Sequence, residues 1–279
     1  MCYPQLMTSV AQIGQDNLSD DAATYAGRRI PSRIFQTWKS KTEFPGGFAY
    51  WMRTFRELNP SFAHLLWDDD DNRDFIAGGF DWFLRTYDGY PREIYRADAV
   101  RYFFLYCYGG IYADMDVECL KPLDRLLELG DIVLVRMGPD PDFPGSVPNA
   151  IMASRPRQEF WLFLISRLLQ AAASPRSPEE TTGPVLLKSA LDLYLTRDLE
   201  WSGAAIRSVA ERLPSGLQPM GGRPRFRLLP SREWFPLDWS DPIHQRVRRE
   251  VLEGRLLTDE VKRELFPHAS MVSYWSHMW

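Results

Sequence analysis

The sequence predicts an α/β fold, with a mostly parallel, doubly wound sheet flanked by helices. Short runs of β-branched and aromatic residues alternate with longer segments of helical periodicity, which is the order expected for such a sheet. The chain has 279 residues, 45% of them hydrophobic and 14% aromatic, which is enough for one sizeable core. We expect residues 1–29 to form a polar N-terminal extension and residues 30–279 to form a single domain.

The first third of this domain should contain two strands, each followed by a helix. In order these are a strand at 33–38, a helix at 47–59, a strand at 62–67 and a helix at 73–86. Asn59 and Pro60 end the first helix, because proline cannot continue it. The acidic run Asp68–Asp71 ends the second strand, and we interpret it as a solvated loop.

The middle of the chain predicts a helix and a strand joined by two glycines. Apolar residues recur at helical spacing from Ile94 to Tyr108, and Gly109–Gly110 is a natural end for that helix. Residues 111–117, IYADMDV, then read as the third strand. Because the helix stops just before the strand, its first half should lie near the end of that strand.

The last part continues the alternation. We expect a strand at 131–137, a strand at 149–154, a helix at 158–173, a surface loop at 171–184 and one or two solvated helices at 243–266. In doubly wound sheets, ligand sites gather at the carboxyl ends of the strands. His64 and His244 have no partner at a telling spacing, so we expect both to be structural.

Bulk composition excludes several classes of protein. The net charge of −4 does not predict nucleic-acid binding. Three cysteines without a CxxC pair argue against a disulfide framework or a thiolate zinc site. The N-terminus lacks a secretory signal pattern, so we expect a cytoplasmic protein. Residues 243–257 have the pattern of a basic amphipathic helix, which would allow peripheral contact with anionic lipid.

Asp114 and Asp116 are the first candidate site residues. On a strand, side chains at i and i+2 point to the same face, so both carboxylates should converge on one object. Two carboxylates that close repel each other unless a cation or proton lies between them. Mg²⁺ or Mn²⁺ is the natural partner, and such ions keep positions for phosphate oxygens. The alternatives are a strand end that carries two solvated acids, or an aspartate that caps the next turn.

Asp98 and Arg101 are the second pair of candidates. Three residues apart on a helix, they share a face and lie near the same sheet end as the aspartates. A carboxylate and a guanidinium beside a metal-binding pair suit a ligand that carries both hydroxyls and phosphates. The alternative is an ordinary surface ion pair.

Residues 97–123, ADAVRYFFLYCYGGIYADMDVECLKPL, resemble the DXD-containing sugar-binding region of retaining glycosyltransferases. This group includes bacterial and fungal α-mannosyl- and α-galactosyltransferases and, more distantly, the clostridial glucosylating toxins. Other segments are similar to further landmarks of the family: 30–40, 59–71, 149–156, 181–187 and 273–279. The sequence departs from the family at Phe35 and Ser273, where histidine is usual. The resemblance implies a nucleotide-binding GT-A fold.

The resemblance also implies residue roles. Asp116 would bind the metal, and Asp114 would reach the metal, the ribose or the sugar. Asp98 and Arg101 would hold hydroxyls of the donor sugar. The remaining candidates are Trp38 against the nucleobase, Tyr112 and Asn149 at the ribose or sugar, His277 at the metal or diphosphate, and Trp279 over the phosphates.

We therefore expect a retaining glycosyltransferase that depends on Mn²⁺ or Mg²⁺. It would move a hexose from a nucleotide-diphosphate sugar, UDP favoured over GDP, to a glycan, lipid or protein acceptor. Two alternatives stay open. The stretch DMDVE at 114–118 also fits the nucleophile motif of haloacid-dehalogenase-type phosphatases, and the chain could be a sugar-nucleotide or glycan-binding protein that has lost catalysis.

Overall fold

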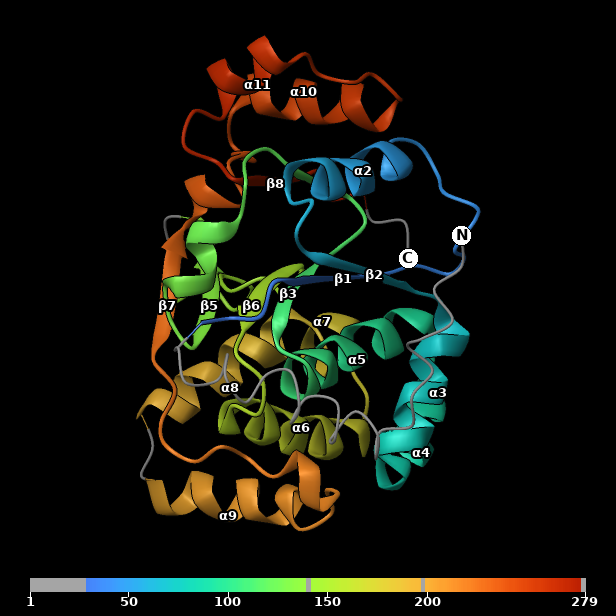
Figure 1. Cartoon of the computed structure of the whole chain (residues 1–279), viewed down its shortest axis with the longest axis vertical. Helices are drawn as coiled ribbons and strands as arrows, with labels where there is room; N and C mark the ends of the chain where they lie inside the picture. The colour runs from blue at the N-terminus through green and yellow to red at the C-terminus, as the bar shows by residue number, and fades with distance from the viewer. Residues whose placement is uncertain (1–28, 139–141, 197–198, 277–279) are drawn as a thin grey trace.

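The computed structural model describes residues 29–138, 142–196 and 199–276. Its centre is a sheet of six strands in the order β2-β1-β3-β6-β5-β7 (Figure 1). The strands are β1 (Arg33–Thr37), β2 (Ala63–Trp67), β3 (Gly110–Ala113), β5 (Ile132–Arg136), β6 (Ile151–Ser154) and β7 (Phe226–Pro230). Only β6 runs against the others in this sheet. The predicted α/β class with a mostly parallel sheet is confirmed.

Helices cover both faces of the sheet (Figure 1). One face carries α5 (Glu93–Cys107), α6 (Glu159–Ala172), α7 (Pro178–Thr181) and α8 (Pro184–Thr196), with α9 (Leu199–Ala210) packed outside α6. The other carries α2 (Phe48–Leu58) and, farther out, α10 (Pro242–Leu252) and α11 (Asp259–Leu265). Next to β2 lie α3 (Asp69–Gly79) and α4 (Asp81–Asp88). Short 3₁₀ turns lie at Asp124–Glu128, Ser215–Leu217 and Ser231–Glu233.

The strands divide their side chains between two cores. Phe35 of β1 and Tyr112 of β3 enter the core that contains α5 and α6. Their neighbours Ile34 and Ile111 enter the core on the opposite face. This alternation follows from the two-residue period of a strand. With both faces buried, the sheet is a rigid base for the residues at its carboxyl ends.

Helix α5 is buried on all sides over its last three turns, more completely than the predicted single apolar face would give. Its predicted end is confirmed, because Gly109 has φ of +58° and Gly110 has φ of +105°. A Cβ atom on Gly110 would lie 2.7 Å from the carbonyl oxygen of Arg33. Glycine therefore lets β3 begin in direct contact with β1.

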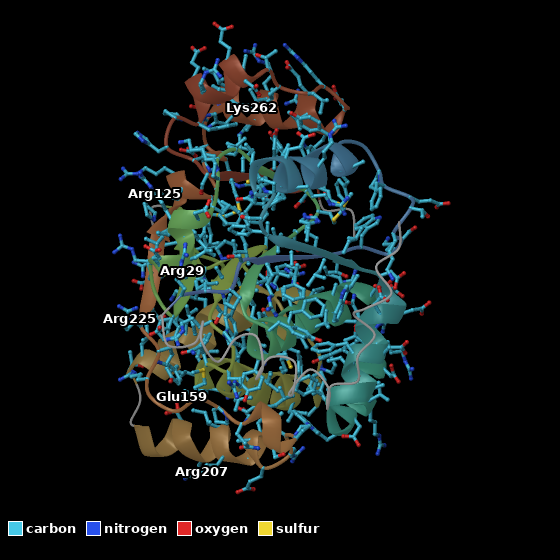
Figure 2. The ribbon with its side chains drawn as sticks, viewed as in Figure 1. Arg29, Arg125, Glu159, Arg207, Arg225 and Lys262 are labelled. Atoms are coloured by element: carbon cyan, nitrogen blue, oxygen red, sulfur yellow. The ribbon has the colours of Figure 1, made fainter. Side chains whose placement is uncertain are left out.

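A second, two-stranded sheet links distant parts of the chain. β4 (Val117–Cys119) pairs antiparallel with β8 (Met271–Ser273), directly after the DXD sequence. Glu118 of β4 forms a buried ion pair with Lys262 of α11, the residue labelled in the outermost layer of Figure 2. The other oxygen of Glu118 accepts a hydrogen bond from the Tyr274 hydroxyl at 2.6 Å. These contacts fix the segment after β8 against the DXD turn.

Two predicted loops are wrong. Asp68–Asp71 begins α3: Asp68 is the N-cap, and Asp68 and Asp71 accept each other's backbone N–H in a capping box. Residues 171–184 contain the end of α6, all of α7 and the start of α8, and Thr181 and Thr182 are buried. Aspartate, serine, threonine and proline suit helix starts as well as loops, so composition alone misjudged both segments.

No helix in the described residues is long and apolar enough to cross a membrane. The two solvated helices expected at 243–266 are present as α10 and α11, and each buries one side through Val247, Val251 or Lys262. The predicted N-terminal extension lies outside the described residues except for Arg29.

Candidate active site

An acidic cavity of about 320 Å³ opens at the carboxyl end of β3. The cavity lies among α5, the DXD turn, the residues before β6 and the segment after β8. Its lining includes Asp98, Arg101, Asp114, Asp116 and Asn149. Five of the predicted site residues therefore line one cavity, although they come from three separate segments of the chain.

The DXD sequence forms a turn, so its prediction as part of a strand is wrong. β3 ends at Ala113, and the N–H of Val117 donates to the carbonyl of Asp114 at 3.2 Å. The turn is held by Asp114 N–H to the Ala150 carbonyl (2.8 Å) and by Tyr274 N–H to the Asp116 carbonyl (3.0 Å). Convergence of the two carboxylates depends on this turn rather than on the two-residue period of a strand.

Asp114 is anchored through one carboxylate oxygen only. Its Oδ1 accepts the Tyr112 hydroxyl at 2.7 Å and lies 3.1 Å from Nη1 of Arg101. Among the described residues, Oδ2 has no hydrogen-bond partner. An ionised carboxylate can accept about four hydrogen bonds, so half of its capacity remains for a ligand.

Asp116 is held by the C-terminal segment. Its Oδ2 accepts the backbone N–H of Ser276 at 2.6 Å. Burial raises the pKa of Asp116, and the hydrogen bond from Ser276 opposes that rise. Burial also raises the pKa of Asp114, and the negative charge of Asp116 adds to that rise.

Asp98 lies deeper, at 5% exposure. Its Oδ1 receives Nη2 of Arg101 at 3.0 Å and Nδ2 of Asn149 at 2.9 Å, and its Oδ2 receives the Thr182 hydroxyl at 3.2 Å. Three of about four acceptor positions are therefore used. One position on Oδ2 is left for a hydroxyl in the cavity.

Arg101 connects these acids. Its exposed fraction is 1%, and all three of its nitrogens have partners, including the carbonyls of Ala97 (3.1 Å) and Asn149 (2.9 Å). The guanidinium thus acts as a buried counter-charge, which fits the predicted hydroxyl contact less well than the predicted pairing with Asp98. Arg101 forms ion pairs with both Asp98 and Asp114. Burial nevertheless raises the pKa values of these two carboxyl groups to about 6.

The cavity fits a hard divalent cation. Asp114 and Asp116 offer carboxylate oxygens, the ligand type that Mg²⁺ and Mn²⁺ prefer. The described residues contain no group of three metal-binding side chains, so within them Asp114 and Asp116 are the two candidate ligands. Such ions are usually bound by one or two carboxylates together with substrate phosphates. The excess negative charge of the cavity and the open Oδ2 of Asp114 favour a cation there.

The remaining predicted residues have different positions. Tyr112 is fully buried and orients Asp114, with Arg101 4.6 Å from the centre of its ring. Trp38 is 6% exposed and packs edge-on against Phe48 at 4.9 Å, so base stacking would require the ring to be uncovered and stays a prediction. His277 and Trp279 lie outside the described residues.

Sequence reasoning assigned no role to several residues of this cavity. Thr182, which lies behind the lining, donates to Asp98 from the turn between α7 and α8. A Cβ atom on the next residue, Gly183, would lie 2.9 Å from the Cα of Glu179 and 3.1 Å from Asp98 Oδ2. Arg92 lines the cavity with an exposed guanidinium. Ser273 lines it with a buried hydroxyl that has no partner in the described part of the chain. A Thr-Gly-Pro run before a helix was the one available signal.

Comparison with known proteins confirms the resemblance. Residues 45–131 match the model of the family described as glycosyltransferase sugar-binding region containing DXD motif. This range contains Asp98, Arg101 and the DXD turn, and ends before Asn149.

The similar proteins include the following two from fungi. Inositol phosphoceramide mannosyltransferase 2 of Schizosaccharomyces pombe is 38% identical over 169 residues, 59% of this chain and 47% of that protein. Mannosyl phosphorylinositol ceramide synthase CSH1 of Saccharomyces cerevisiae is 31% identical over 213 residues, 75% of this chain and 54% of that protein. The chain spans about half the length of these relatives. The solved structure of the PaToxG glycosyltransferase covers 75% of this chain and 86% of its own, at 14% identity and a TM-score of 0.45, too low to add to the argument.

Proposed function

We propose that this chain is a retaining, divalent-metal-dependent hexosyltransferase that uses a nucleotide-diphosphate sugar. The observation that carries the proposal is the open acceptor capacity of Asp114 and Asp98. Both carboxylates line the same cavity. Every nitrogen of Arg101, which pairs with both of them, already has a partner in the protein. Asp114 and Asp116 would hold Mn²⁺ or Mg²⁺, which would neutralise the diphosphate as it leaves. The match over residues 45–131 supports the same assignment.

The donor sugar would lie toward α5. The remaining lone pair of Asp98 Oδ2 accepts a sugar hydroxyl, and the unpartnered hydroxyl of Ser273 is a further candidate contact. Arg92 stands at the N-terminal end of α5, where a cation suits the diphosphate or nucleotide phosphates. Arg101 and Tyr112 position the aspartates without touching the donor.

Retention would follow from attack on the same face that the diphosphate leaves. Asp98 is already held by Arg101, Asn149 and Thr182, and Asp114 and Asp116 are assigned to the metal. The fourth carboxylate of the lining, Glu179, is exposed on α7, and we assign none of the four as a covalent nucleophile. The bond from the anomeric carbon to the phosphate oxygen breaks, and the bond to the acceptor oxygen forms on that face. The acceptor proton passes to the departing phosphate oxygen.

The relatives guide the choice of substrates. Their names specify mannosyl transfer and an inositol phosphoceramide, so mannose and a lipid-linked acceptor become the first candidates. An enzyme with such an acceptor would work at a membrane surface. The nucleotide stays a prediction, with UDP before GDP.

The decisive experiment is a donor-hydrolysis screen. UDP- and GDP-hexoses are incubated with the full chain in Mn²⁺ and in EDTA, and release of the nucleoside diphosphate is measured. We expect hydrolysis of one donor in Mn²⁺ and its loss in EDTA. NMR of a transfer product should then show the anomeric configuration of the donor.

Two results would contradict the proposal. Inversion at the anomeric carbon would overturn retention. Hydrolysis of simple phosphate monoesters that disappears in Asp114→Asn, without any sugar-nucleotide hydrolysis, would favour the phosphatase alternative.

A further inference from the structure

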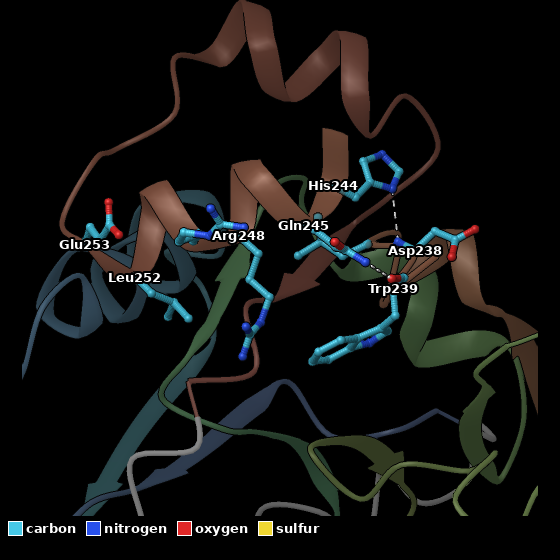
Figure 3. Close-up of a pocket in the computed structure, with 9 residues that line it drawn as sticks. Asp238, Trp239, His244, Gln245, Arg248, Leu252 and Glu253 are labelled. Carbon is cyan, nitrogen blue, oxygen red and sulfur yellow. Dashed lines mark hydrogen bonds between the residues drawn. The ribbon is translucent and has the colours of Figure 1, made fainter. Parts of the chain in front are cut away.

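A second cavity, of about 410 Å³, lies beneath α10 (Figure 3). We call it the Trp239 pocket, defined by Trp239, His244, Gln245, Arg248, Arg249 and Leu252. Its volume lies in the range of small-molecule sites. From the sequence, His244 was expected to be structural and residues 243–257 to form a basic amphipathic helix; none of the six residues was predicted to bind substrate, and none lines the acidic cavity.

Trp239 gives this pocket an aromatic wall. The indole is 46% exposed, and Gln245 fixes its backbone by donating to the Trp239 carbonyl at 2.5 Å. In Figure 3 the indole and the Arg248 side chain both extend below α10. The Arg248 guanidinium lies 4.8 Å from the centre of the indole ring. The part of the ring that stays exposed suits the C–H face of a pyranose or cyclitol ring, because that contact removes apolar surface of both partners from water.

Two arginines, Arg248 and Arg249, and two acids, Asp238 and Glu253, line the pocket, and the Asp238 carboxylate is already hydrogen-bonded to Ser240. Arg248 donates through Nε to the Tyr274 carbonyl at 2.8 Å and through Nη2 to the Trp275 carbonyl, and among the described residues its Nη1 has no hydrogen-bond partner. Within the described chain neither Arg248 nor Arg249 forms an ion pair, whereas Arg246 on the same helix lies 3.9 Å from Glu250. Guanidinium groups in this state favour a phosphate or carboxylate.

His244 offers a hydrogen-bond donor for a ligand hydroxyl. Nδ1 of His244 accepts the backbone N–H of Asp238 at 3.0 Å, the contact drawn in Figure 3. The other ring nitrogen of a neutral His244 therefore carries the proton and can donate to a hydroxyl.

Trp275 lies between the acidic cavity and Trp239. This residue lines the acidic cavity, and its ring lies 6.0 Å from that of Trp239. Its backbone is in the left-handed region at φ of +52°, an unfavourable conformation for tryptophan that the hydrogen bond from Arg248 helps to hold. The next residue, Ser276, binds Asp116. A ligand on Trp239 would therefore lie directly beside the metal-binding turn.

We propose that the Trp239 pocket is the acceptor subsite, and that it takes a ring polyol carrying a phosphate group. The ring packs on Trp239, the phosphate binds Arg248 and Arg249, and a ring hydroxyl reaches past Trp275 toward the donor. This assignment rests on the proposed function.

Binding is tested first, without donor or metal. Isothermal titration calorimetry is run on the full chain with three probes: myo-inositol 1-phosphate, myo-inositol and inorganic phosphate. We expect the phosphorylated ring to bind at least tenfold more tightly than either fragment. Trp239→Ala and Arg248→Gln should each weaken it about tenfold, while Arg246→Gln, a matched change outside the pocket, should not. Equal binding of inorganic phosphate, or no effect of Trp239→Ala, would overturn the proposal.

Transfer is tested second, with the donor that the hydrolysis screen identifies. Mass spectrometry should detect a hexosylated myo-inositol 1-phosphate, and Trp239→Ala should raise the KM for this acceptor about tenfold with kcat changed less than about twofold. An unchanged KM would overturn the acceptor role. Probe binding with no sugar-nucleotide hydrolysis by any donor would overturn the proposed function and the acceptor role together, while the pocket would remain a phosphopolyol site.

Discussion

Two groups of aspartates in this chain differ in their spacing along the sequence, their burial and their hydrogen bonds. Asp68–Asp71 is a contiguous run, whereas Asp98, Asp114 and Asp116 are dispersed in sequence and meet in the acidic cavity. Among the described residues, Asp68 and Asp71 form ion pairs with Lys41, and Asp98 and Asp114 form ion pairs with Arg101.

The difference between them is how far the charge is satisfied. Asp68 and Asp71 accept each other's backbone N–H at 3.0 Å, and both contact Lys41 near the surface. These contacts hold the pKa of Asp68 below its usual value although its partial burial acts the other way. In the acidic cavity burial dominates, and the pKa values of Asp98 and Asp114 rise to about 6. Unbalanced charge, rather than a high density of acids, marks the site.

The largest effect is expected from removing the buried counter-charge. Arg101→Met leaves Asp98 and Asp114 buried without a cation and should lower the free energy of unfolding by about 3–5 kcal/mol. Lys41→Met, the matched change at the surface, should cost less than about 1 kcal/mol. Urea denaturation of both variants measures the contrast. Adding Asp98→Asn to Arg101→Met should restore part of the loss, and equal costs for the two single changes would contradict our interpretation of the two groups.

The next effect concerns catalysis. Asp116→Asn removes one of the two proposed metal ligands and should reduce donor hydrolysis in Mn²⁺ by about 10³-fold, because charge stabilisation of the leaving group is lost. Asp70→Asn makes the same chemical change on an exposed residue of α3 and should leave the rate within about twofold. Comparable losses in the two variants would remove the distinction between the groups.

A smaller effect should follow from pH. Because the pKa of Asp114 is raised to about 6, the proton is held until the pH exceeds that value. Mn²⁺ must displace it, so Mn²⁺ affinity should be constant above about pH 7 and fall up to tenfold per unit below about pH 6. Calorimetric titration between pH 5 and 8 measures this. The cap at Asp68, whose pKa is lowered, should stay ionised throughout, and a Mn²⁺ affinity independent of pH would be incompatible with a buried carboxylate ligand.

The smallest effect belongs to the surface group alone. Asp68→Ala removes the N-cap of α3 and should lower the free energy of unfolding by about 1 kcal/mol. Donor hydrolysis should not change. Thermal unfolding and the hydrolysis assay on the same sample would test both expectations, and a catalytic defect would place the run in the active site after all.

The sheet could be predicted from the sequence where a strand is buried on both faces. Ile132–Arg136 is such a run, and its apolar residues predict a strand without knowledge of the strands that pair with it. Phe226–Pro230 was missed because it is short, half-exposed and contains two residues with polar or cyclic character, Arg227 and Pro230. β8 was missed for a related reason, since its three residues are a strand only through pairing with β4.

The sequence predicted which residues line the site, but only partly how they come together. Asp98 and Arg101 were paired from helical spacing, and their ion pair at 3.0 Å confirms the spacing argument. Asp114 and Asp116 were paired from strand spacing, yet they converge through a turn held by Ala150 and Tyr274. Thr182 reaches Asp98 across 84 residues of chain. No local pattern contains a contact of that kind.

The hydrogen bond from Ser276 to Asp116 joins residues 160 positions apart. A ribosome makes the acidic turn long before it makes the strand β8 that braces it. During synthesis the nascent sheet must therefore carry its clustered negative charge without this brace, exposed to the metal ions of the surrounding solution. Loop closure over such a distance is slow, so we expect cation affinity to be among the last properties this chain acquires as it folds.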